Sequence, residues 1–132
     1  MNRYVLEIEV PSSAIDALGH VNNVRYFDYV HEAYVELLMG VFQEARVSGT
    51  VETVVVRHEM NHVGQMNLRP DAYEVWSRVA EVGQSSVTLE SEIRDGDTVL
   101  ARSRVIEVNV DRSGAAEQWH PLHLELFRSR IG

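Results

Sequence analysis

The sequence has no cysteine, and this absence excludes several kinds of chemistry. Disulfide bonds, thiolate nucleophiles and cysteine-bound zinc all need a thiol that the chain does not have. Such a composition fits a reducing compartment, and we expect a cytoplasmic protein. The N-terminal stretch agrees with this expectation, because Glu7 and Glu9 stand where a signal peptide needs an apolar run.

Long apolar runs and clusters of basic residues are also missing. No segment approaches the roughly 20 apolar residues of a membrane-spanning helix, so we expect no membrane association. The formal net charge is −8 and no basic stretch offsets it, which disfavours nucleic-acid binding. With 132 residues, 45% of them hydrophobic, the chain can form one globular domain with a substantial core over residues 1–132.

Most of the chain alternates in the manner of β-strands. One long amphipathic helix is expected over residues 24–39, with Gly40 as its stop. A run of strands after one helix indicates an α+β protein, with a curved, mainly antiparallel sheet around that helix. The expected strands cover residues 3–10, 51–62, 73–82, 87–94 and 98–110, and a short helix is expected over 121–127. The apolar stripe of the long helix consists of Val24, Phe27, Val30, Ala33, Tyr34, Leu37 and Leu38.

The loop before the long helix concentrates polar chemistry. From Asp16 to Asn23 it reads D-A-L-G-H-V-N-N and ends where the helix begins. The first N–H groups of a helix have no intrahelical partner and lie at the positive end of its dipole. Such a place stabilises anions and developing negative charge.

This loop and the residues after it resemble the hot-dog-fold acyl-CoA thioesterases of the 4-hydroxybenzoyl-CoA thioesterase family. The resemblance extends over almost the whole chain. It implies a helix inside a sheet, homodimers or homotetramers with active sites between subunits, and hydrolysis of acyl thioesters of coenzyme A or acyl carrier protein. Coenzyme A then enters as part of the substrate, and no metal or other cofactor is implied. The residues that carry the resemblance are Asp16, Gly19, His20, Val21, Asn22, Asn23, Tyr26, Phe27, Glu32 and Ala33, with the later V-V-V-R, G-x-S-S and A-R-S-R-V-I-E-V-N-V-D patterns.

The resemblance makes Asp16 the expected catalytic group, either as the base that activates water or as a nucleophile. The alternative for Asp16 is a local hydrogen bond that shapes the loop. The backbone N–H of Asn23 matches the amide that polarises the thioester carbonyl, although Asn22 and Asn23 are equally good helix caps. His20 is a further catalytic candidate, with loop filling as the alternative. Glu32, on the helix, is a weaker candidate for the catalytic carboxylate than Asp16.

Substrate contacts are expected along the same loop and at a distant turn. The Gly83 to Ser86 turn corresponds to a region near the coenzyme A moiety in the family, and a plain hairpin turn is the alternative. The coenzyme's phosphates need cations, because the net charge of the chain repels them. The expected substrate-binding residues are Gly19, Val21, Asn22, Tyr26, His58, Gly83, Ser85 and Ser86, and the arginine candidates are Arg46, Arg57, Arg69, Arg78, Arg94 and Arg102.

Residues 58–62 spell H-E-x-x-H, the pattern of zinc proteases. That pattern works on a helix, whereas the preceding V-E-T-V-V-V-R indicates a strand. In a strand the two histidines lie about 13 Å apart, which is too far to share a zinc ion with bonds of about 2 Å. We therefore expect no metal site there, and His58 remains a candidate for lining a substrate pocket.

Two departures from the family pattern keep other functions open. Ala14 stands where many members have a second Asp, and His62-Val63-Gly64 replaces an aromatic residue followed by proline. A non-hydrolytic acyl-thioester-binding protein of a lipid or polyketide pathway is therefore one alternative. A hot-dog hydratase or dehydratase is another, but the His with a distant Asp or Glu on which those enzymes rely belongs to a motif that the sequence does not contain.

Overall fold

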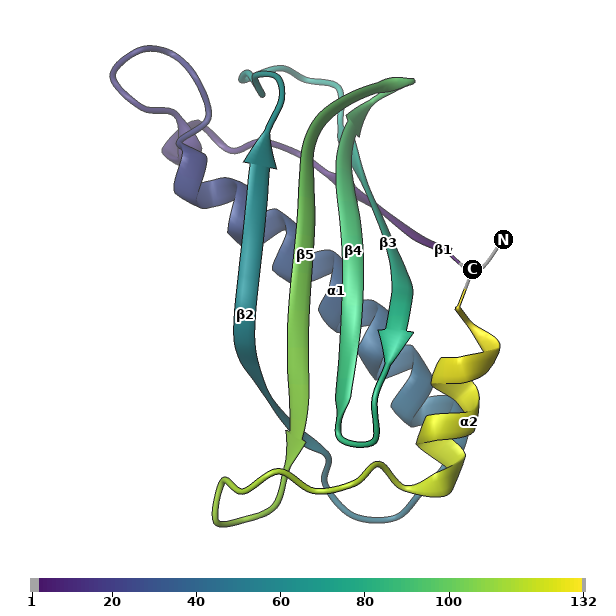
Figure 1. Cartoon of the computed structure of the whole chain (residues 1–132). Helices are drawn as coiled ribbons and strands as arrows, with labels where there is room; N and C mark the ends of the chain where they lie inside the picture. Colours follow the sequence, from purple (N-terminus) through teal and green to yellow (C-terminus); the bar gives the residue numbers. More distant parts are fainter. Residues whose placement is uncertain (1–2, 132) are drawn as a thin grey trace.

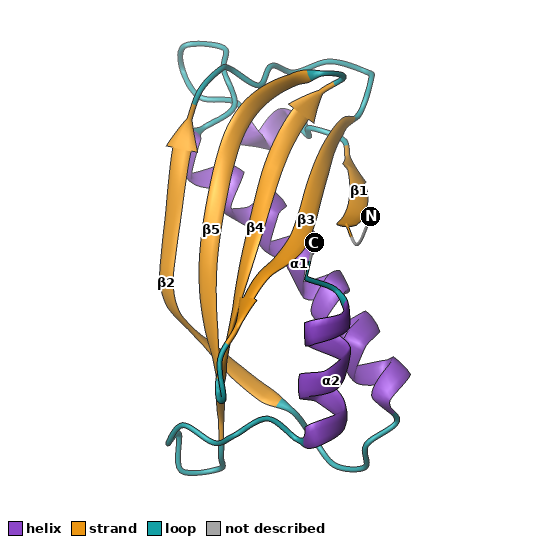
Figure 2. Cartoon of the chain, turned by 45° about the vertical axis from the view of Figure 1, so that its right-hand side comes forward, coloured by secondary structure: helices purple, strands orange, loops and turns teal. Residues whose placement is uncertain are grey.

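The computed structural model describes residues 3–131, and its elements follow the expected order of one strand, a long helix, four strands and a short helix (Figure 1). The long helix, α1, crosses one face of the sheet diagonally, and the short helix, α2, packs beside its C-terminal end (Figure 2). The elements are β1 (Arg3–Ile8), the 3-10 turn η1 (Ser12–Ala14), α1 (Asn23–Ala45), β2 (Glu52–His62), β3 (Tyr73–Val82), β4 (Ser86–Asp95), β5 (Thr98–Val110) and α2 (Pro121–Ser129).

The five strands form one antiparallel sheet in the order β1-β3-β4-β5-β2. Alternate residues of β3, β4 and β5 face α1 and are buried, as the period-two pattern of these segments predicts. We call the side that α1 covers the inner face and the opposite side the outer face. Because β2 pairs with β5 alone, its other edge is unpaired within the described residues.

The expected stop of the long helix at Gly40 is wrong, since α1 continues to Ala45. Val41 is completely buried and the Phe42 ring packs 6.0 Å from the Phe127 ring of α2. Glycine inside a helix costs only about 1 kcal/mol relative to alanine, and burying two apolar side chains outweighs that cost. The helix ends instead at Ala45, and the C-cap residue Arg46 has a left-handed φ of 53°.

The apolar stripe of α1 also differs from the expected one at its start. Val24 is 68% exposed, whereas Tyr26 and Tyr29 are buried. Tyr26 and Tyr29 each lie four residues before a buried residue, Val30 and Ala33 respectively, so the buried stripe is continuous. The N-terminal turn of α1 therefore presents polar groups and one valine to solvent.

The C-terminal segment closes the core beyond the end of α1. The ring centroids of Trp119 and Phe127 lie 4.9 Å apart with the ring planes tilted by 58°, and both rings contact Phe42 of α1. His123 of α2 is buried beside them, and burial lowers the pKa of its imidazole. None of the helices within residues 3–131 is both long and apolar enough to cross a membrane.

Candidate active site

A closed loop lies directly before α1. The carbonyl of Ala14 accepts a hydrogen bond from the N–H of Asn22 at 2.9 Å, which closes the loop at its base. Further in, the N–H of Asp16 donates to the carbonyl of His20 at 2.8 Å. Gly19 completes the turn with a φ of +82°, a conformation that glycine adopts without steric cost. The loop therefore folds back on itself and brings Asp16 beside the residues that lead into the helix.

The carboxylate of Asp16 is half-buried and engaged through one oxygen. Its Oδ1 accepts from the N–H of Leu18 at 2.9 Å and from the N–H of His20 at 3.2 Å. These are the local hydrogen bonds of the alternative interpretation, and they fix the side chain in one orientation. Among the described residues no partner occupies Oδ2. One oxygen thus shapes the turn while the other is available to a water or a substrate.

The N-terminus of α1 begins beside this loop. Asn22 is its N-cap, and its Oδ1 accepts from the N–H of Val24 at 2.9 Å, so the capping alternative holds for Asn22. Asn23 is the first helical residue, and its N–H has no hydrogen-bond partner within residues 3–131. An unpaired N–H at the positive end of the helix dipole is suited to hold an oxyanion.

The segment around Met66 anchors both the loop and the helix. The N–H of Val21 donates to the carbonyl of Met66 at 3.0 Å, and His20 forms a bridge with Asn67. The hydroxyl of Tyr26 accepts from the N–H of Met66 at 2.8 Å, and burial raises the pKa of this phenol. Val21 and Tyr26 are both buried, so their side chains support the site from beneath. No local pattern in the sequence indicates this anchoring.

The two histidines of the H-E-x-x-H stretch lie on β2, which is a strand as expected. The Nε2 of His58 lies 2.8 Å from the hydroxyl of Ser103, and burial lowers the pKa of the imidazole. Its ring contacts Phe27 of α1 at 4.6 Å, and the His62 ring contacts Tyr26 at 4.7 Å. No group of three or more metal-ligating side chains occurs in the part of the chain that the structure describes.

The turn from Gly83 to Ser86 lies at the opposite end of the sheet from the loop of Asp16 (Figure 1). Its backbone is already bonded, since the N–H of Trp119 donates to Gln84 at 2.8 Å and the Trp119 indole donates to Ser86 at 3.0 Å. The carbonyl of Ser85 accepts from Asn109 at 2.7 Å. Within one chain, the two groups of expected substrate contacts therefore do not meet.

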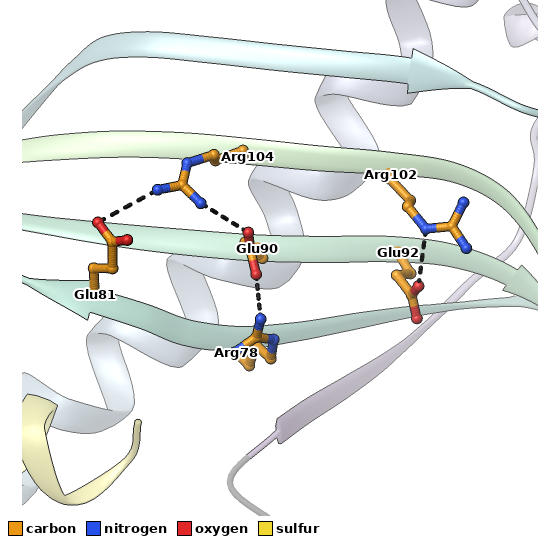
Figure 3. A network of polar contacts seen from close by, with 6 residues as sticks. All are labelled: Arg78, Glu81, Glu90, Glu92, Arg102 and Arg104. Carbon is orange, nitrogen blue, oxygen red and sulfur yellow. Dashed lines mark hydrogen bonds and ion pairs between the residues drawn. The ribbon is translucent and has the colours of Figure 1, made fainter. Parts of the chain in front are cut away.

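Most of the arginine candidates are already paired with carboxylates. Glu90 and Glu92 hold a network on the outer face, away from α1 (Figure 3). Within residues 3–131, Arg46 alone of the six candidates has no ion pair. The paired candidates are Arg57 with Glu59, Arg69 with Asp95, Arg78 with Glu90, and Arg94 and Arg102 with Glu92.

Comparisons with known proteins agree with this architecture. Residues 10–123 match the thioesterase-like superfamily. The chain belongs to this superfamily. No curated protein matches the chain at a significant level.

Solved structures of thioesterases share the whole fold at low sequence identity. A predicted thioesterase from Bacillus stearothermophilus superposes with a TM-score of 0.88 at 22% identity, covering 98% of this chain and 97% of the other. A thioesterase from Thermus thermophilus, complexed with coenzyme A and Zn, superposes with a TM-score of 0.81 at 22% identity, covering 96% of this chain and 92% of the other. The probable thioesterase YbaW from Escherichia coli superposes with a TM-score of 0.81 at 22% identity, covering 98% of this chain and 99% of the other. The expected hot-dog fold is thereby confirmed.

Proposed function

We propose that the protein is an acyl thioesterase that hydrolyses a thioester of coenzyme A or of acyl carrier protein. The observation that carries this proposal is the position of the Asp16 carboxylate. The hydrogen bonds from the N–H groups of Leu18 and His20 fix this carboxylate in the loop that leads directly into the N-terminus of α1. A base in the loop that precedes the unpaired N–H of Asn23 supplies the two functions that thioester hydrolysis needs.

The proposed reaction uses water as the nucleophile. Asp16 accepts a proton from water through its free oxygen, and the water oxygen bonds to the thioester carbon. The carbonyl oxygen becomes an oxyanion, which the N–H of Asn23 and the helix dipole stabilise. The carbon–sulfur bond then breaks, the thiolate takes up a proton, and the free acid leaves. His20 lies in the same loop, where it can position the water.

The proposed active unit is a homodimer or a larger homo-oligomer. The free edge of β2 exposes three consecutive valines, Val54, Val55 and Val56, with exposed fractions of 41%, 47% and 59%. An unpaired apolar edge strand is a template for pairing with another chain, and an isologous pair is the common solution for identical chains. Light scattering should give at least twice the 15.0 kDa of one chain. Val55→Lys should shift the protein toward a monomer, and a monomeric active wild type would contradict this assembly.

A screen over acyl-CoA substrates tests the activity. The protein is incubated with straight-chain and aromatic acyl-CoAs, and free coenzyme A is detected with a thiol reagent, which meets no background because the protein has no cysteine. Hydrolysis of at least one substrate above the spontaneous rate is expected. Binding of acyl-CoA without release of thiol would favour the non-hydrolytic alternative, with which the turn bonds of Asp16 are also compatible.

A further inference from the structure

Glu107 of β5 has no role in the proposed reaction, yet its environment is unusual. It is the one acidic residue among residues 3–131 that is buried, with 6% of its surface exposed. Its Oε1 accepts a hydrogen bond from the hydroxyl of Thr53 at 3.0 Å. Its Oε2 is buried and has no partner in the described part of the chain. Burial raises the pKa of this carboxyl group.

A buried, half-satisfied carboxyl group works against stability. The unpaired oxygen loses its hydration on folding and receives no hydrogen bond in return. A leucine or methionine of similar size at this position gives a more stable core. A buried group of this kind therefore calls for an explanation other than folding, and a ligand group that pairs with it is such an explanation.

The surroundings of Glu107 connect it to the loop of Asp16. Phe27, His31 and Tyr34 lie at spacings of four and three along α1 and share one face of the helix. The His58 ring contacts Phe27 at 4.6 Å and lies 6.3 Å from Tyr34. His31 and Tyr34 both interact electrostatically with Glu107. A continuous strip of side chains thus runs between α1 and β2 from the start of the helix to Glu107.

The length of this strip follows from helix geometry. At a rise of 1.5 Å per residue, His31 lies about 12 Å and Tyr34 about 16 Å along the axis from Asn23. An extended chain advances about 1.2 Å per bond, so an acyl chain covers this distance in about 10 to 14 bonds. A hydroxybenzoyl group, which is only one ring long, is too short to reach Glu107 from the helix N-terminus.

In the single chain, the strip has an apolar border at the β2 edge and is open on that side. Val55 lies directly across from Glu107 in the pairing of β2 with β5 and is 47% exposed. His31 is exposed on the helix side. An alkyl chain that lay along this border would bury methylene groups against Val55 and Phe27 and would end beside Glu107.

We propose that Glu107 is a specificity-determining residue for acyl thioesters whose chain carries a hydroxyl group about 10 to 14 bonds from the thioester carbon. The proposal rests on the thioesterase function and names its substrate class. The hydroxyl donates to Oε2 when Glu107 is ionised and accepts from it when Glu107 is protonated. An unsubstituted chain leaves Oε2 unpaired and so binds less well.

The test compares dodecanoyl-CoA with ω-hydroxydodecanoyl-CoA, whose hydroxyl lies within this range. Wild type should show a kcat/KM about 10-fold higher for the hydroxylated substrate, the value of one hydrogen bond. Glu107→Leu should abolish the preference by lowering hydrolysis of the hydroxylated substrate, and Glu107→Gln should reduce it. The matched control is Glu81→Gln, which removes an equal charge from a carboxylate that is 69% exposed and should keep the preference.

Equal rates for the two substrates in wild type would overturn the proposal. An equal fall for both substrates in the Glu107 variants would overturn it too, because a purely structural role lowers both alike. Glu107→Gln keeps the acceptor for Thr53 and serves if Glu107→Leu does not fold.

A second measurement separates this proposal from the thioesterase function. The melting temperature of wild type is recorded with dodecanoic acid and with ω-hydroxydodecanoic acid, which bind without any reaction. The hydroxy acid should stabilise wild type more, and the difference should vanish in Glu107→Leu. Such a result without hydrolysis of any acyl-CoA would refute the thioesterase function and support the proposed role of Glu107. Hydrolysis of acyl-CoA together with equal or no stabilisation by the two acids would refute the proposed role of Glu107 and support the thioesterase function.

Discussion

Replacing Asp16 by Asn tests the proposed mechanism most directly. The change keeps the shape of the side chain, and the amide oxygen can still accept from Leu18 and His20. It removes the negative charge, so the side chain can neither take a proton from water nor attack the thioester. General-base assistance is worth about 10²–10⁴ in rate, which corresponds to about 3–5.5 kcal/mol of transition-state stabilisation.

The expected signature is a fall in kcat with a much smaller change in KM. In the proposed mechanism, binding depends on the N-terminus of α1, on acyl burial and on phosphate contacts, none of which uses the carboxylate of Asp16. A fall of at least about 100-fold in kcat with nearly constant KM marks a lost transition-state interaction. The assay is thiol release from the best acyl-CoA of the screen, with melting temperature and oligomer size as controls for folding.

Two further variants separate catalysis from turn formation. Asp28→Asn makes the same chemical change at a helix position whose side chain is 61% exposed, and kcat should stay within about twofold of wild type. Asp16→Ala removes both turn bonds and should also destabilise the protein by about 1–2 kcal/mol. A folded Asp16→Asn protein with near-normal kcat would leave Asp16 only its structural role, and the search for the base would move to His20 and Glu32.

Glycine geometry, metal chemistry and a buried carboxyl group give three more tests. Gly40→Ala should raise the melting temperature by about 2–4 °C, because the position is helical and has open space, whereas Gly19→Ala should lower it because of its positive φ; calorimetry that ranks them otherwise would contradict this. A strong chelator should leave hydrolysis unchanged, since His58 and His62 lie on a strand; loss of activity that zinc restores would reverse this conclusion. Burial raises the pKa of Glu107 above the ordinary value of 4.5. Between the pKa of the unfolded state and that of the folded state, the folded protein keeps a proton that the unfolded chain releases, so the free energy of unfolding should fall as the pH rises through this interval. Urea unfolding should show this slope in wild type and not in Glu107→Gln.

Local patterns predicted β3, β4 and β5 because each of these strands buries alternate residues of its own sequence. The expected ranges 73–82 and 98–110 match β3 and β5 to the residue, and the start of α1 is displaced by one residue. The end of α1 was not predictable in this way. Its last turns are held by the aromatic side chains of Trp119 and Phe127, which are far away in sequence.

The candidate site divides in the same manner. The loop from Asp16 to Asn23 is a local motif, so the sequence could indicate both its turn and its helix cap. The anchoring of Tyr26 by Met66, 40 residues further on, depends on tertiary structure alone. The sequence indicated the position of Glu107 in part, because this residue lies between Val105 and Asn109 in the series of alternate β5 residues that face inward. An acidic residue in such a register indicates a buried polar group, although not its partner.

The separation of the Asp16 loop from the Gly83 to Ser86 turn leads to a test of where the site is completed. α1 is about 34 Å long, and the two regions lie near its opposite ends (Figure 1). Antiparallel pairing of two β2 edges turns one copy by a half rotation, so the turn of each copy moves to the end that holds the Asp16 loop of the other. A substrate that contacts both regions then spans two chains.

Mixed oligomers of two inactive variants test this arrangement. Asp16→Asn removes the base, and Ser85→Glu places a negative charge where the coenzyme's phosphates are expected. Each variant alone should hydrolyse acyl-CoA poorly. After co-refolding in equal amounts, half of the dimers are mixed, and each mixed dimer has one site with an intact Asp16 from one chain and an intact Ser85 from the other.

The mixture should therefore regain about a quarter of the wild-type activity. If each site were built from one chain, every site in the mixture would carry one of the two substitutions, and activity would stay at the level of the separate variants. The control is a mixture of the Asp16→Asn variant with wild type. Its activity should equal the fraction of wild-type chains, whether each site is built from one chain or from two.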